Sequence, residues 1–129
     1  MADRLITSQD LEIKITEIQN GLRLSTKAAV IRICIGLSLK EGGDPRDIRQ
    51  NQLRDNTGMN YHKHTVFGDD ESVYYLMVKQ NLRTNVSKNS FFPELTKAHL
   101  LRGMEKLYEQ YSLHRNPQKV IEWLIQQTV

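Results

Sequence analysis

The first third of the chain repeats apolar residues at helical spacing. Four apolar positions follow an i, i+4, i+7, i+11 pattern, which makes one stripe of a helix: Leu11, Ile15, Ile18 and Leu22. Ser8 stands just before this stripe. Asn20 and Gly21 follow it, and glycine readily takes the left-handed backbone that ends a helix. The pattern therefore predicts a helix over about residues 8–20.

A second helical segment, about residues 26–41, is apolar on nearly all sides. Ser25 or Thr26 caps its start, and the run Gly-Gly-Asp-Pro at 42–45 ends it. A helix that is apolar all round is buried in a core or in a subunit interface. This helix is too short to cross a membrane, and it contains Arg32. We expect it to be the most buried element and to take part in a subunit contact.

A polar stretch and a short β-like run follow. Residues 44–60 are polar and mixed in charge, which predicts a surface loop with at most a short turn. Residues 61–67, YHKHTVF, are rich in β-branched and aromatic side chains and predict a strand that ends at Gly68.

Helical patterns return in the second half of the chain. An acidic start at 69–71 predicts a helix to about Leu82, with an inward face of Val73, Leu76, Met77 and Gln80. A loop over 83–90 precedes a helix over about 93–113. Its apolar face is predicted to contain Leu95, His99, Leu100, Met104, Leu107, Tyr108 and Tyr111. A last short helix begins near Pro117 and packs through Val120, Trp123 and Leu124.

These elements indicate one compact, mainly α domain over residues 1–129, with one or two short strands. A chain of 129 residues builds a single core. Residues 3–7 form a possible strand, and the two predicted helices follow it. The N-terminal half therefore has a ribbon-helix-helix outline, which is shared by a class of DNA-binding proteins.

Composition and charge narrow the classes further. One cysteine excludes an internal disulfide framework, and no apolar run is long enough to cross a membrane. The N-terminus has no secretory signal pattern, so we expect a cytosolic protein. The formal net charge of +3 is spread along the chain. A monomer would offer nucleic acid only a scattered footprint, whereas an oligomer would repeat any small basic patch by symmetry.

Two groups of residues have chemical potential. Cys34 could be a sulfur nucleophile, but its apolar neighbours predict a buried structural thiol. A second group could bind a divalent metal for phosphodiester hydrolysis: His62, His64, Asp69, Asp70 and Glu71. The alternative for this group is a polar strand face followed by an acidic helix start. We adopt the alternative, and predict no catalytic residue, no metal and no cofactor.

Three stretches together resemble the DndE family, the small subunit of bacterial DNA sulfur-modification (phosphorothioation) systems. The first is 30–39, with an arginine followed by Leu-Ser-Leu. The second is 61–79, a run containing a threonine and a glycine before an acidic helix start. The third is 97–107, with an Ala-His-Leu-x-Arg-Gly signature. Their order and approximate spacing agree over about residues 8–110.

The resemblance implies a DNA-binding accessory protein of compact helical fold that is a non-enzymatic or weakly enzymatic partner of the modification machinery. It also implies homo-oligomers, with a tetramer favoured, and binding to double-stranded DNA, including nicked duplex. A cysteine desulfurase and an iron–sulfur partner would deliver the sulfur.

Several basic residues are candidates for phosphate contacts. The family's basic cluster before Gly21 is absent here, so the resemblance leaves Lys14, Arg23 and Lys27 as substitutes. Lys27 lies near a helix N-terminus, where backbone amides also attract anions. The full set of predicted DNA-binding residues is Lys14, Arg23, Lys27, Arg32, Lys63, Lys97 and Arg102.

Two alternatives remain open at the level of sequence. One is a DNA-nicking endonuclease of the same system, which would use the histidine and carboxylate group. The other is a ribbon-helix-helix transcription regulator, for which the N-terminal strand offers Arg4 and Thr7 as base-reading side chains.

Overall fold

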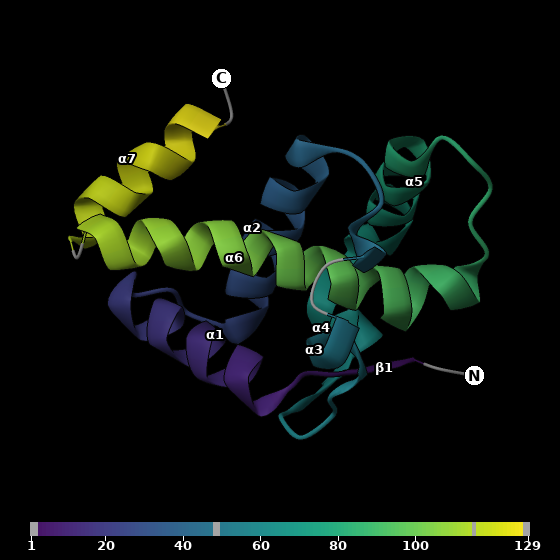
Figure 1. Cartoon of the computed structure of the whole chain (residues 1–129), viewed down its shortest axis with the longest axis horizontal. Helices are drawn as coiled ribbons and strands as arrows, with labels where there is room; N and C mark the ends of the chain where they lie inside the picture. Colours follow the sequence, from purple (N-terminus) through teal and green to yellow (C-terminus); the bar gives the residue numbers. More distant parts are fainter. Residues whose placement is uncertain (1–2, 48–49, 115, 128–129) are drawn as a thin grey trace.

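A computed structural model describes residues 3–47, 50–114 and 116–127. The longest helix, α6 (Thr96–His114), runs through the middle of the molecule, and α2 (Lys27–Glu41) crosses behind it (Figure 1). Helices α1 (Gln9–Gly21) and α7 (Pro117–Gln127) lie on opposite sides of α6. The mainly α fold class predicted from the sequence is confirmed.

The first two helices begin where the sequence indicates, because side-chain oxygens satisfy their first turns. The Ser8 side chain accepts a hydrogen bond from the Leu11 amide, and Thr26 accepts one from the Ala29 amide. Such caps are worth about 1 kcal/mol each. Between the possible caps Ser25 and Thr26, the structure therefore uses Thr26.

The two strands are shorter than predicted and pair with each other. Strand β1 (Arg4–Ile6) runs antiparallel to β2 (Asn60–His62), with Leu5 opposite Tyr61. The prediction of a strand over 61–67 is wrong beyond residue 62, because residues 63–67 form helix α4 (Lys63–Phe67). The His62 side chain caps that helix by accepting from the His64 amide, and Val66 and Phe67 are buried. Local capping and burial outweigh the β-propensity of this run.

The predicted loop over 44–60 also contains short helices. A 3-10 turn, η1 (Pro45–Asp47), and helix α3 (Gln50–Arg54) lie within it.

Helix α5 (Glu71–Leu82) follows a 3-10 turn, η2 (Gly68–Asp70), and faces the core differently from the prediction. The prediction of an inward face is wrong here, because Val73, Leu76, Met77 and Gln80 are exposed. Instead Val78 is buried, and the ring of Tyr74 lies 4.9 Å from that of Phe67. The large aromatic contacts decide which face of the helix is buried, since the helix carries apolar residues on both sides.

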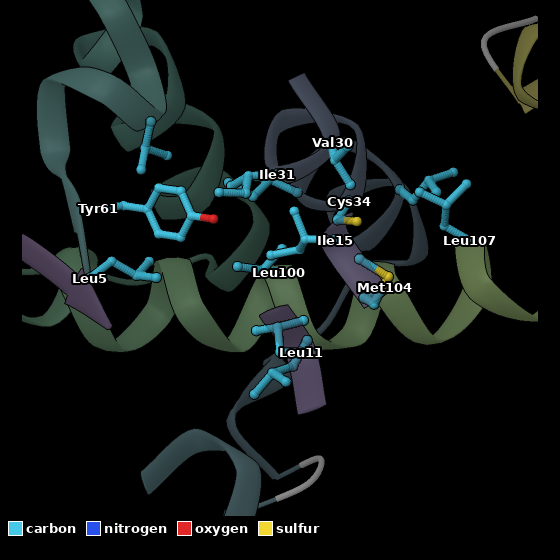
Figure 2. Close-up of a cluster of buried hydrophobic side chains, with 14 of the residues drawn as sticks. Leu5, Leu11, Ile15, Val30, Ile31, Cys34, Tyr61, Leu100, Met104 and Leu107 are labelled. Atoms are coloured by element: carbon cyan, nitrogen blue, oxygen red, sulfur yellow. The ribbon is translucent and has the colours of Figure 1, made fainter. Parts of the chain in front are cut away.

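The core lies where α2 and α6 cross, covered by α1, α4 and the sheet. Figure 2 shows the side chains of α1 and α2 gathered against α6. Ten residues of α6 and seven of α2 are buried. The prediction that residues 26–41 form the most buried element is therefore wrong, because α6 buries more. A wide turn, η3 (Ser90–Leu95), leads into α6.

Candidate nucleic-acid interface

The residues of the Leu-Ser-Leu and Ala-His-Leu-x-Arg-Gly stretches meet inside the protein. The Ser38 hydroxyl lies 2.7 Å from His99 Nδ1, and Arg102 Nε donates to the same hydroxyl oxygen at 2.8 Å. Arg102 also donates to the carbonyls of Ser38 and Gly42, and it pairs with Glu41 at 3.1 Å. Because the Ser38 oxygen accepts from Arg102, its own proton is available to His99 Nδ1.

His99 is neutral in this network. Its side chain is fully buried, and burial together with the Arg102 charge lowers the pKa of His99 to about 4. Among the described residues its Nε2 atom has no hydrogen-bond partner. A protonated ring would place a second cation beside Arg102, which disfavours protonation. The neutral His99 ring accepts a hydrogen bond from the Ser38 hydroxyl inside the packed core. Both side chains are closed to solvent, which leaves no place for a substrate.

Gly103 explains why this signature ends in glycine. A Cβ atom added there would lie 1.7 Å from the carbonyl oxygen of Cys34. The backbones of α2 and α6 therefore touch at this point, and the neighbouring Ser38–His99–Arg102 network binds the two helices together.

Three of the predicted DNA-binding residues serve the fold. Arg102 is only 8% exposed, and its guanidinium is used within the network. Lys97 is 4% exposed, and its Nζ donates to the Asp55 carbonyl at 2.7 Å and to Asn56 Oδ1 at 3.0 Å. Arg32 is half-buried and donates to the Val66 carbonyl at 2.9 Å. Bonds within the chain thus occupy all three cations.

Lys63 and Lys14 are more accessible, and each is paired with a carboxylate. Lys63 lies 3.3 Å from Glu71. Lys14 lies 3.4 Å from Asp10, and its Nζ is 5.1 Å from the centre of the Tyr108 ring.

The connection between α1 and α2 presents Arg23 and Lys27. Arg23 is exposed in the turn, where its backbone takes a left-handed conformation with φ of 58°. Lys27 opens α2, and its Nζ lies 2.9 Å from Glu12. Lys14 comes two residues after Glu12, and residues two apart in a helix do not share a face. Lys14 and the carboxylate that holds Lys27 therefore lie on different faces of α1.

The histidine and carboxylate group does not assemble. In the described part of the chain, no three His, Cys, Asp or Glu side chains are placed to hold a metal ion. His62 caps α4 and lies 3.4 Å from Asp3, whereas Glu71 pairs with Lys63. The expected strand that would align His62 with His64 is absent, since His64 belongs to α4.

Cys34 is buried at the helix crossing, as predicted. Burial raises the pKa of its thiol far above the ordinary range. A protonated, buried thiol cannot act as a nucleophile in this conformation.

The family of the chain follows from a comparison with family models. The model described as DNA sulphur modification protein DndE matches residues 4–115. The chain belongs to the DndE family. Membership gives it a role in DNA sulfur modification. A search of curated proteins found no match. None of the helices in the described part of the chain is long and apolar enough to cross a membrane.

A basic cavity was not predicted from the sequence of this DndE-family chain. Its volume is about 420 Å³, and four of the described residues that line it are cationic: Arg4, Arg46, Arg54 and Lys97. Only Lys97 was among the predicted DNA-binding residues. Arg4 comes from the first strand, whereas Arg46 and Arg54 come from a 3-10 turn and a short helix about forty residues later, so no local spacing brings Arg4 to the other two.

Proposed function

We propose that this DndE-family protein is a DNA-binding accessory subunit of a DNA phosphorothioation system. It holds duplex DNA, including nicked duplex, through backbone phosphates. The observation that carries the proposal is the placement of Arg23 and Lys27 at the connection that leads into α2, with Arg23 exposed and Lys27 in the first turn of the helix.

The start of α2 has the chemistry of a phosphate site. The first amides of a helix have no acceptor within the helix, and its dipole favours an anion there. Thr26 satisfies the Ala29 amide and leaves the earlier amides for a ligand. A phosphate would compete with Glu12 for Lys27, while Arg23 reaches solvent from the turn. Such contacts position the backbone and carry no sequence information.

We propose further that the protein works as a homo-oligomer, with a tetramer favoured. The formal charge of +3 gives one copy few phosphate contacts, and symmetry multiplies them. An apolar groove of about 470 Å³ between α2 and α7 supports an interface with a second copy. It is lined by Ile33, Gly36, Leu37, Lys40, Ile121, Leu124, Ile125 and Gln127.

In this proposal the protein acts in the cytoplasm and does not carry the sulfur. The burial of Cys34 supports delivery of sulfur by other proteins, a cysteine desulfurase and an iron–sulfur partner. The nicking alternative lacks support, since its five residues do not form a metal cluster in the described ranges.

Charge reversal at the α1–α2 connection tests the DNA contact. In fluorescence anisotropy, the Arg23→Glu, Lys27→Glu double variant should bind a nicked duplex at least about tenfold more weakly. Its log–log salt slope should flatten by about 0.9 for each phosphate that the variant no longer neutralises. Arg83→Glu is the control, because Arg83 is exposed with the same left-handed backbone as Arg23 but ends α5, which lies on the other side of the molecule from α1 (Figure 1). Equal weakening in both variants, or unchanged binding in both, would contradict the proposed contact.

A further inference from the structure

The basic cavity is built by separate parts of the fold. Strand β1 supplies Arg4 and Ile6, and α3 supplies Leu53 and Arg54. The remaining lining comes from η1, from the segment after α3, from η3 and from α6: Arg46, Asn56, Pro93, Glu94 and Lys97. Because α6 and the sheet belong to the core, the cavity has a rigid base.

Two of its arginines have no carboxylate beside them. In residues 3–47, 50–114 and 116–127, no acidic side chain lies within ion-pair distance of Arg4 or Arg54. Both side chains are exposed at the cavity. Arg46 is different, because Asp44 binds it at 2.7 Å and Glu94 lies 3.4 Å away.

The charge at the cavity is positive and fixed. Among the described residues, Arg4 and Arg54 supply two positive charges that no ion pair offsets, whereas Asp44 and Glu94 pair with Arg46, and the charge of Asp55 interacts with Lys97. The carboxylate of Asp55 is turned to the hydroxyl and amide of Thr57. A phosphate monoester carries a charge close to −2 at neutral pH and matches this balance. Guanidinium groups bind phosphate oxygens in pairs, which suits Arg4 and Arg54.

The size and the apolar wall indicate more than a bare phosphate ion. A volume of about 420 Å³ lies in the ordinary range for small-molecule sites. Ile6, Leu53 and Pro93 are half-buried and give the cavity an apolar side next to the arginines. A sugar or a base attached to the phosphate would cover that side.

We propose that this cavity binds the 5′-phosphate of a nucleotide, with Arg4 and Arg54 on the phosphate and Leu53 and Pro93 against the attached nucleoside. The site is distinct from the α1–α2 connection. The choice of a nucleotide among phosphate monoesters rests on the proposed function, whereas the phosphate contacts themselves do not. The nucleotide is either free or at a DNA end.

Isothermal titration calorimetry with deoxyadenosine 5′-monophosphate tests the site on the full chain. We expect saturable binding of the monophosphate and none of deoxyadenosine. Arg4→Gln and Arg54→Gln should each weaken binding about tenfold or more. Lys119→Gln removes the same charge far from the cavity and should change affinity less than twofold. Circular dichroism melting verifies that each variant is folded.

Three DNA ligands distinguish a DNA end from a free nucleotide in the cavity, and the cavity proposal from the proposed α1–α2 contact. A duplex with a 5′-phosphate at its nick should bind more tightly than one with a 5′-hydroxyl if the cavity takes a DNA end, and Arg54→Gln should remove that preference. Equal binding of both, with intact monophosphate binding, assigns the cavity to a free nucleotide. Closed circular duplex reports on the α1–α2 contact alone. Binding of closed duplex without monophosphate binding, or monophosphate binding that survives both arginine variants, overturns the cavity assignment.

Discussion

Acidification should destabilise this protein through His99. In the unfolded chain a histidine protonates with a pKa of about 6.5, whereas burial and the Arg102 charge lower the pKa of His99 to about 4 in the folded protein. Between these values the unfolded state binds the extra proton, so stability falls as the pH falls through this window. Going from pH 7 to pH 5 should cost about 2 kcal/mol from His99.

Thermal unfolding followed by circular dichroism measures this effect. For a chain of this length, about 2 kcal/mol corresponds to a decrease in Tm of about 7 °C. The part of this Tm decrease that His99 causes should vanish in His99→Gln. The remaining pH dependence of that variant comes from the other histidines and the acidic groups. A direct NMR titration of the His99 ring should show it neutral at pH 5. Equal pH slopes in the two proteins, or a ring that is protonated at pH 5 in the folded state, would refute the reasoning.

Three further changes probe the helix crossing, the thiol and the apolar groove. Gly103→Ala should lower the free energy of unfolding in urea titrations by about 3 kcal/mol or more, because the new Cβ overlaps the Cys34 carbonyl; unchanged stability would contradict the close contact of α2 and α6. Cys34→Ala should cost on the order of 1 kcal/mol and leave cellular phosphorothioation within a few-fold of normal; complete loss of modification by the folded variant would assign the thiol a chemical role. Ile121→Glu should dissociate the oligomer in analytical ultracentrifugation, whereas Leu76→Glu, at an exposed apolar position on α5, should leave it intact; an unchanged Ile121→Glu assembly would place the interface elsewhere.

Periodicity located the helices best where one face alone is apolar. Leu11, Ile15 and Ile18 are buried on α1, as their spacing predicts, and Val120 anchors α7. Periodicity predicts the wrong face of α5, because apolar residues lie on both sides of this helix. The tertiary aromatic contacts determine which side is buried. The prediction also failed at 63–67, where a side-chain cap from His62 starts a helix in β-prone sequence.

The candidate site was harder to predict than the fold. Residue type identifies a cation but not its partners, so residue type alone does not separate Arg102 and Lys97 from Arg23. Their partners are carbonyls and side chains from distant segments, such as Ser38 for Arg102 and Asp55 for Lys97. The same long-range assembly creates the cavity at Arg4 and Arg54. Apolar residues near Lys97 and Arg102 were a usable local signal, since a cation in such a run is often buried.

Light scattering of the pure protein, alone and with a nicked duplex, tests the central claim most directly. The claim is that several copies of this DndE-family chain gather their basic residues on one DNA molecule. The expected result is an oligomer without DNA, with a tetramer favoured, and a heavier complex of that same oligomer with one duplex at low salt. The complex should dissociate as salt increases. A monomer with and without DNA, or an oligomer that leaves nicked duplex unbound at low salt, would contradict the account.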